Sequence, residues 1–236
     1  MPDFNFSPFS WLTFDCYGTL IDWEAGILSY LRPLFQFKGR SLDDAEILGL
    51  YSELEPREQA GPYRAYRDVL DGVVRGFARE LRFEVTAAET TGLAESLAHW
   101  EPFPDTVAGL RRLHSRYKLA ILSNIDDELF AYSAPKLQVA FDCVVTAQQV
   151  HSYKPSIANF EALLQRLGIS RWRLLHVAES LYHDVAPAQS LGISTVWVNR
   201  RQGRSAAASR RVDVRAACEV NDIVQLAELA APDGTN

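Results

Sequence analysis

The residues best suited to chemistry start at an aspartate that closes an apolar run near the amino terminus. Residues 9–14 are typical of a buried strand, and Asp15 follows them directly. Open α/β sheets bind their ligands at the carboxyl ends of strands, so we expect Asp15 to face a site. Gly18 allows the chain to leave the strand sharply, and Thr19 completes the turn. We predict that Asp15 and Thr19 are catalytic; an ordinary turn at a strand end is the alternative.

Polar side chains also follow three later segments of the chain. A lysine beside a nucleophilic carboxylate keeps that group ionised and stabilises the charge of the transition state. Hydroxyl and amide donors hold carboxylates or oxyanions, and an acid can deprotonate water. The candidates are Ser123 and Asn124 after the apolar residues 117–122, Lys154 before Pro155, and Glu179, His183 and Asp184 after the apolar residues 174–178. Each of them alone also fits a surface, a turn or a partly buried position.

Together these segments resemble the four motifs of the haloacid dehalogenase (HAD) superfamily. Residues 15–22 are similar to the first motif, and Ser123, Lys154 and residues 179–184 are similar to the other three, in the same order. The resemblance spans nearly the whole chain. It implies an α/β fold, with a Rossmann-like parallel sheet core and an inserted helical cap domain. It also implies a hydrolase in which Asp15 is the nucleophile and forms an aspartyl ester.

Tyr17 narrows the expected chemistry within that superfamily. Most of its phosphatases carry a second aspartate at this position, which protonates the departing alkoxide, whereas the haloacid dehalogenase branch has tyrosine. A phenol with a pKa of about 10 is a poor general base at neutral pH, and halide leaves carbon without being protonated. Asp15 and Tyr17 therefore favour attack at carbon. We count Tyr17 and Cys16 as substrate-binding; Cys16 is a poor nucleophile because the adjacent carboxylate raises the pKa of its thiol.

The chain departs from the dehalogenase branch in the cap. That branch places an arginine early in the cap, where it receives the halide and the substrate anion, and Ser52 stands at that position here. Arg57, Arg64 and Arg67 lie nearby in the sequence. We predict that Arg57 or Arg67 binds the substrate in its place, with Arg64 a further candidate, although a helical face of arginines is usually solvated.

The fourth motif also differs from that of the haloacid dehalogenase branch. Splitting an ester requires a base that activates water, and we predict Asp184 for this role with Glu179 as helper. The branch usually has Ser and Asn near position 179, and Glu179 with Asp184 is closer to the spacing of phosphatases, which hold Mg²⁺. We therefore predict no cofactor for a dehalogenase and keep Mg²⁺ open for a phosphatase. Phe160 also replaces a tyrosine of the branch.

The pattern of apolar runs indicates how these residues are positioned. Five strand-like runs, four of them separated by helix-length segments after residue 100, predict a parallel sheet covered by helices; they are residues 11–16, 119–123, 143–146, 174–178 and 195–199. Residues 23–98 are almost entirely helical in pattern. We predict a catalytic core of residues 1–20 and 99–236 and a helical cap of residues 21–98, with a hinge at residues 101–104. Residues 201–211 are typical of an exposed basic loop.

Composition limits the class of protein and of partner. A chain of 236 residues with 47% hydrophobic residues can bury a full core. A net charge of −6, with no long basic run interleaved with aromatic residues, argues against nucleic acid as a partner. The apolar runs are too short to span a membrane, and the first residues do not begin a signal peptide, so we expect a cytoplasmic protein. Cys16, Cys143 and Cys218 predict reduced thiols. The expected partner is a small anionic molecule, and the resemblance adds a possible homodimer.

Three functions compete at this point. The first is hydrolytic displacement at carbon, with a short 2-haloacid or a related small carboxylate as substrate. The second is a Mg²⁺-dependent phosphatase acting on a small phosphate ester, which Glu179 and Asp184 favour. The third is a binding protein without activity, which the missing cap arginine favours and the presence of the other charged motif residues opposes.

Overall fold

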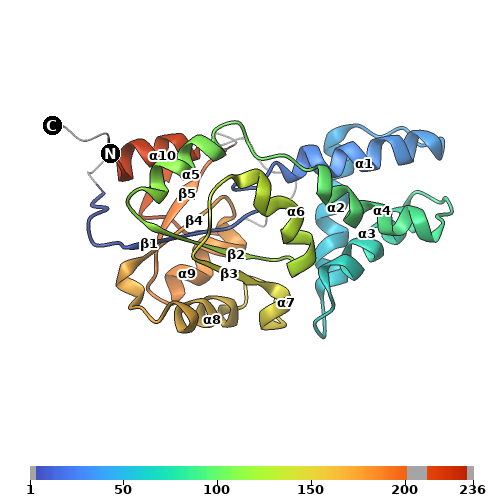
Figure 1. The fold of residues 1–236 in the computed structure, drawn as a ribbon. Coiled ribbons are helices and arrows are strands. Elements are labelled where there is room, and N and C mark those ends of the chain that lie inside the picture. Colours follow the sequence, from blue (N-terminus) through green and yellow to red (C-terminus); the bar gives the residue numbers. More distant parts are fainter. Residues whose placement is uncertain (1–3, 201–211, 233–236) are drawn as a thin grey trace.

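The computed structural model describes residues 4–200 and 212–232 and is built around a parallel β-sheet. Its six described strands lie in the order β3-β2-β1-β4-β5-β6 (Figure 1). The strands are β1 (Trp11–Phe14), β2 (Lys118–Ser123), β3 (Cys143–Thr146), β4 (Leu174–Ala178), β5 (Ser194–Val198) and β6 (Cys218–Val220). The predicted α/β fold with a parallel core is confirmed, and β6 is an edge strand that the sequence pattern did not indicate.

The register of the central strands brings the predicted site residues to one edge of the sheet. In β1, Phe14 lies beside Ile121 of β2 and Val177 of β4. The strands run in the same direction, so the residues that follow these three positions leave the sheet together. Asp15 therefore emerges next to the ends of β2 and β4, where Ser123 and Glu179 stand.

Helices cover both faces of this sheet, as expected for parallel strands with apolar side chains on both sides. One face packs on α5 (Thr106–His114), α6 (Asp127–Leu137) and α10 (Ile223–Ala230). The other packs on α8 (Ile157–Leu167) and α9 (Ala186–Ser190), where Phe160 and Leu163 meet Leu122 and Leu174. A short helix, α7 (Ala147–Val150), follows β3. The core is thus a three-layer sandwich with its site at the carboxyl edge of the sheet.

Four further helices lie together at one end of the molecule (Figure 1). They are α1 (Trp23–Phe37), α2 (Asp44–Gln59), α3 (Tyr66–Glu80) and α4 (Ala87–Ser96). Asp22, Asp43 and Thr86 cap three of them by accepting a backbone N–H of the first turn. We call this group the cap, and we retain its division from the core at residues 21 and 98 as a proposal.

The two chain segments that join cap and core run side by side. Asp22 donates its backbone N–H to the carbonyl of Glu101 over 2.9 Å, and Phe103 donates to the carbonyl of Leu20 over 3.0 Å. These two backbone hydrogen bonds join the outgoing and returning connections between the core and the cap. The basic segment 201–211 lies outside the described residues. No helix in the described part of the chain has the length and apolar character needed to cross a membrane.

Candidate active site

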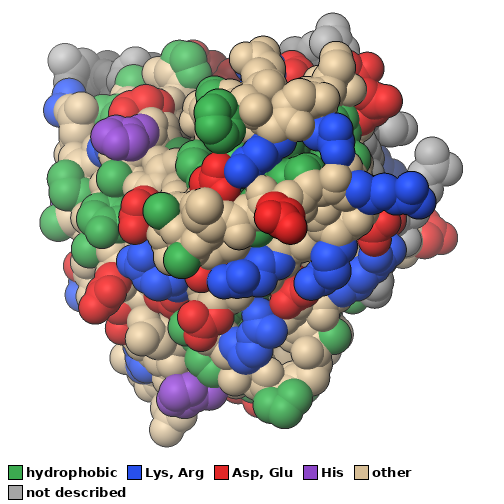
Figure 2. Space-filling view, turned by 90° about the vertical axis from the view of Figure 1, so that its right-hand side faces the viewer, with side chains coloured by type: hydrophobic (Ala, Val, Ile, Leu, Met, Phe, Trp, Pro, Cys, Tyr) green, Lys and Arg blue, Asp and Glu red, His purple; other side chains and the backbone are tan. Residues whose placement is uncertain are grey.

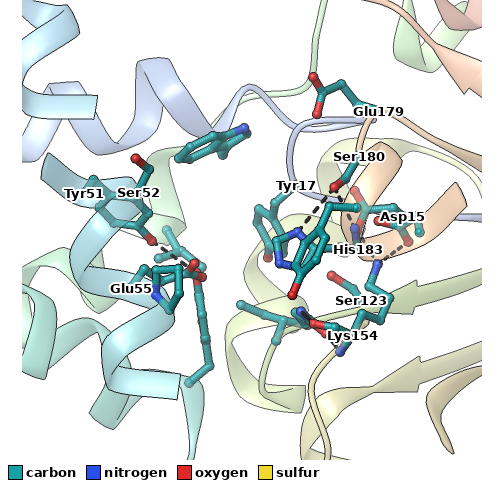
Figure 3. A pocket seen from close by; sticks show the side chains of 18 of the residues that line it. Asp15, Tyr17, Tyr51, Ser52, Glu55, Ser123, Lys154, Glu179, Ser180 and His183 are labelled. Carbon is teal, nitrogen blue, oxygen red and sulfur yellow. Dashed lines mark hydrogen bonds and ion pairs between the residues drawn. The ribbon is translucent and has the colours of Figure 1, made fainter. Parts of the chain in front are cut away.

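A pocket lies between the carboxyl edge of the sheet and the cap helices (Figure 3). The core wall contributes the strand-end residues, and α2 and the start of α3 form the cap wall. The predicted residues that line it are Asp15, Tyr17, Ser123, Asn124, Lys154, Glu179, His183 and Asp184, and Ser52, which stands at the position of the branch's arginine, lines it too. The structure therefore brings most of the sequence candidates into one cavity.

Asp15 is almost completely buried and is held by two donors. The Thr19 hydroxyl donates to Oδ2 over 2.9 Å, and the Lys154 ammonium donates to Oδ1 over 2.8 Å. Gly18, with φ of 99°, makes the turn that returns Thr19 to the carboxylate. The Thr19 hydroxyl also accepts the backbone N–H of Glu179 over 3.0 Å, which ties the end of β4 to the same turn. Burial raises the pKa of Asp15, while Lys154 and Thr19 oppose that shift.

Lys154 occupies the centre of the site with only 2% of its side chain exposed. Its ammonium donates to Asp15, to Asp184 Oδ1 over 2.6 Å and to the carbonyl of Leu122 over 2.9 Å. These three bonds use all its protons. Burial lowers the pKa of Lys154, but the two carboxylates outweigh that effect and raise it. The ammonium is therefore a fixed positive charge between two acids.

Asn124 positions this lysine through its backbone. Its Oδ1 accepts the N–H of Lys154 over 2.7 Å, and its Nδ2 donates to the Lys154 carbonyl over 3.0 Å. Both polar atoms of the side chain are thus engaged by the lysine loop. Asn124 therefore positions Lys154, and because it also lines the pocket its contact with substrate stays a prediction.

His176 is a site residue that sequence reasoning missed. It lies inside β4, fully buried, and its Nε2 is 2.9 Å from Asp184 Oδ1. The polar side chain in an otherwise apolar strand was the available signal. Despite burial, Lys154 and His176 lower the pKa of Asp184 to about 2. Phe160 stacks edge-on against the His176 ring at 5.1 Å and is not among the residues that line the pocket.

Glu179 and Ser123 are the other two strand-end residues of the core wall. Burial raises the pKa of Glu179 to about 7, and the nearby charges of Asp15 and Asp184 act in the same direction. Trp197 holds its backbone by donating to the Glu179 carbonyl over 2.8 Å. The Ser123 hydroxyl is buried and has no hydrogen-bond partner within the described chain. Such a hydroxyl is suited to a ligand that enters the pocket.

Tyr17 is held as a neutral phenol. Its hydroxyl lies 2.9 Å from Ser133 Oγ in α6, and burial raises its pKa well above the ordinary value. It contacts Trp100 edge-on at 5.9 Å. Cys16 is fully buried and does not line the pocket, so its predicted contact with substrate is not seen. Burial and Asp15 raise the pKa of its thiol.

The cap wall presents Tyr51, Ser52 and Glu55 to the pocket (Figure 3), and Tyr66 lines it as well. Within the described ranges, the cap contributes no basic side chain to this lining. Figure 2 looks onto the cap end of the molecule, where basic and acidic side chains are intermixed. Arg57 pairs there with Glu53 at 3.1 Å, and Arg64 pairs with Glu58 at 3.2 Å.

The backbone of Arg67 lies near the core, and its N–H donates to Asp126 Oδ2 over 2.8 Å. Neither it nor Arg57 nor Arg64 lines the pocket. The structure therefore does not place the predicted cap arginines at the site. His183 does line the pocket, and its backbone N–H donates to Ser180 Oγ over 3.0 Å.

Comparison with known proteins decides the family. A family model described as haloacid dehalogenase-like hydrolase matches residues 9–192, which include all four motifs. The chain belongs to the haloacid dehalogenase-like hydrolase family. This family membership agrees with the resemblance drawn from the motifs and with the arrangement of Asp15, Lys154 and Asp184 found here.

Individual members of the family resemble the chain over most of its length. An (S)-2-haloacid dehalogenase of Pseudomonas sp. (strain YL) is 28% identical over 195 residues, covering 80% of this chain and 82% of that protein. The L-2-haloacid dehalogenase from Xanthobacter autotrophicus with chloropropionic acid covalently bound has a TM-score of 0.77 at 18% identity, covering 94% of this chain and 98% of that one. A glyceraldehyde 3-phosphate phosphatase of Methanothermobacter thermautotrophicus is 30% identical over 145 residues, covering 60% and 63%.

The site of this HAD-like hydrolase is arranged for nucleophilic displacement. One oxygen of Asp15 faces Lys154 and the other faces Thr19, so the carboxylate is aimed by two fixed donors. In the described part of the chain, no three His, Cys, Asp or Glu side chains are grouped as metal ligands. Asp15 and Asp184 instead share the Lys154 ammonium between them. The arrangement can therefore form and stabilise an ester on Asp15.

Proposed function

We propose that this HAD-like hydrolase cleaves the carbon–halogen bond of a short 2-haloacid through an ester on Asp15. The observation that carries the proposal is that the site contains both Asp15, a nucleophile bound by Lys154, and Tyr17 at the position of the phosphatases' second acid. Where a phosphatase needs an acid that protonates an alkoxide, this site holds a phenol bonded to Ser133 with a raised pKa. Halide departs without a proton, so this site is matched to it.

In the first half-reaction, an oxygen of Asp15 attacks the carbon that carries the halogen. The carbon–oxygen bond forms as the carbon–halogen bond breaks, and the halide leaves with the bonding electrons. The buried Ser123 hydroxyl is placed to donate to the substrate carboxylate. Lys154 keeps Asp15 ionised before attack, and it is held rigidly for this by Asn124 and Asp184.

In the second half-reaction, water attacks the ester carbonyl of Asp15 and a base takes its proton. Lys154 and Thr19 then stabilise the oxyanion that develops on the ester. Glu179 suits the base role better than Asp184. Its pKa of about 7 matches neutral pH, whereas Asp184 is bound by Lys154 and His176 and has a pKa of about 2. The product is a 2-hydroxy acid, and Asp15 keeps one oxygen from water.

A second candidate function is a phosphatase, and Glu179 is the observation that favours it. This acid lines the pocket beside Asp15, as expected if both carboxylates helped to bind Mg²⁺. One relative is named a phosphatase. Phosphate release from a small phosphate ester in Mg²⁺, lost on adding a chelator, would support this function. Release that persists in chelator would contradict it.

The test of the leading proposal is halide release from (S)-2-chloropropionate. The wild-type chain and Asp15→Asn are compared, and Asp22→Asn is the matched control, because Asp22 is a nearby acid that caps α1. We expect halide release by the wild type and by Asp22→Asn and none by Asp15→Asn. Equal release by Asp15→Asn, or phosphate release without any halide release, would overturn the proposal.

A further inference from the structure

The cap wall of the pocket carries an acid that the reaction described above does not use. Glu55 lies on α2, one helical turn after Ser52, and faces the pocket opposite Asp15 and Lys154 (Figure 3). The described residues that line the pocket carry four carboxyl groups and one lysine; the acids are Asp15, Glu55, Glu179 and Asp184. The lysine is already shared by two of them.

Among the residues that the structure describes, Glu55 has hydrogen-bond donors but no positive charge beside it. Its Oε1 accepts the Tyr66 hydroxyl over 3.0 Å and the Gln59 amide over 2.8 Å. Among the described residues, no donor reaches Oε2 and no lysine or arginine forms an ion pair with this side chain. Burial raises the pKa of Glu55 to about 7. Glu55 is partly buried in the pocket wall. Withdrawing a carboxylate from water without a cation beside it is costly, and a cationic ligand would relieve that cost.

Aromatic rings surround this carboxylate on the cap side. Tyr51 and Tyr66 line the pocket with their hydroxyls 3.1 Å apart, and Trp23 packs on Tyr51 with ring centroids 5.6 Å apart. Ring faces attract organic cations, and an acid beside them adds a hydrogen-bond acceptor and a full charge. This combination is suited to an ammonium group and unsuited to a second carboxylate.

The opposite wall supplies a donor where the cap wall supplies an acceptor. The Ser123 hydroxyl is buried, lines the same pocket and has no partner in the described chain. A ligand with a carboxylate at one end would satisfy it. The pocket therefore has a core wall that donates, where Ser123 lies beside Asp15, and a cap wall that accepts, where Glu55 lies (Figure 3).

We propose that the substrate is a zwitterion: a short carboxylic acid with an ammonium group, its carboxylate at Ser123 and its ammonium at Glu55. Glu55 is then the residue that determines specificity, and Tyr51 and Tyr66 form the surface on which the ammonium rests. This inference rests on the proposed displacement at carbon for its chemistry, but the binding of a zwitterion does not depend on that chemistry.

The kinetic test uses two substrates of equal size. 3-Amino-2-chloropropionate carries an ammonium where 2-chlorobutyrate carries a methyl group. Halide release from both is measured with the wild type, with Glu55→Gln and with Glu53→Gln, an exposed acid on the same helix that pairs with Arg57. We expect the wild type to prefer the ammonium substrate at least tenfold in kcat/KM. Glu55→Gln should lose that preference while still cleaving 2-chlorobutyrate, and Glu53→Gln should keep it.

A binding test separates this inference from the proposed function. Calorimetry compares 3-aminopropionate with butyrate, which have no halogen and also differ only in ammonium against methyl. Tighter binding of 3-aminopropionate by the wild type, lost in Glu55→Gln, supports the inference even if no halide is ever released. Halide release with equal kcat/KM for both chlorinated acids would keep the proposed function and overturn the ammonium site. So would tighter binding of butyrate.

Discussion

Replacing Glu55 by glutamine should stabilise the fold at alkaline pH and leave it unchanged in acid. Burial raises the pKa of Glu55 from its ordinary 4.5 to about 7, so the folded protein binds more protons than the unfolded chain between these values. Stability therefore falls as pH rises through this window. Ionising Glu55 costs the fold about 3 kcal/mol at pH 8, and less than about 0.5 kcal/mol at pH 4.5. Glutamine cannot ionise, and its amide oxygen still accepts from Tyr66 and Gln59.

Urea unfolding at the two pH values measures this difference. The free energy of unfolding of Glu55→Gln should exceed that of the wild type by about 3 kcal/mol at pH 8 and by almost nothing at pH 4.5. Glu53→Gln removes an acid from an exposed ion pair on the same helix and should change stability by less than about 1 kcal/mol at both. A loss of stability in Glu55→Gln at pH 8 would show that Glu55 has a cationic partner in the folded protein, which would refute the reasoning.

Three further outcomes follow from the site. Glu179→Gln should slow hydrolysis of the ester more than its formation. In the wild type, the rate of ester hydrolysis should rise about tenfold from pH 6 to pH 8, because a base with a pKa of about 7 ionises in that range. Single-turnover kinetics measure both effects. Lys154→Met should abolish halide release and cost about 3 to 5 kcal/mol in urea unfolding, since it leaves two buried acids unpaired. His176→Leu should cost about 1 to 3 kcal/mol and raise the pKa of Asp184, followed by NMR titration of that carboxyl.

Much of the core site was predictable because it depends on strand ends. In a parallel sheet every strand delivers its last residue to the same edge, so the apolar runs before Asp15, Ser123 and Glu179 indicated a shared edge. The resemblance to the four motifs then identified these residues as one site. Lys154 was found through its motif. Its contacts with both Asp15 and Asp184 needed the folded loop, because they join residues far apart in the chain.

The residues of the cap wall were predicted less well, because the geometry of helix α2 decides which side chains reach the pocket. Ser52 and Glu55 are three residues apart on α2 and share the face that lines the pocket. Arg57 is five residues from Ser52, which turns it to the exposed side, where it pairs with Glu53. The search for a replacement arginine followed sequence distance, whereas the phase of the helix decides which side chain reaches the substrate.

Other differences arise where one side chain could serve two purposes. Asn124 has donors and an acceptor suited to substrate, but the folded chain uses them on the backbone of Lys154. His176 gave only the weak signal of one polar residue in a buried strand, and its partner Asp184 lies on the turn that follows. Such pairings depend on tertiary contact and not on local pattern.

The central claim is that Asp15 forms an ester during turnover, and isotope labelling tests it most directly. The wild type is allowed several turnovers of (S)-2-chloropropionate in water enriched in heavy oxygen, and the peptide that contains Asp15 is analysed by mass spectrometry. We predict heavy oxygen in the Asp15 carboxyl, because water attacks the ester at that residue. Halide release with heavy oxygen only in the 2-hydroxy acid, and none in Asp15, would contradict the account.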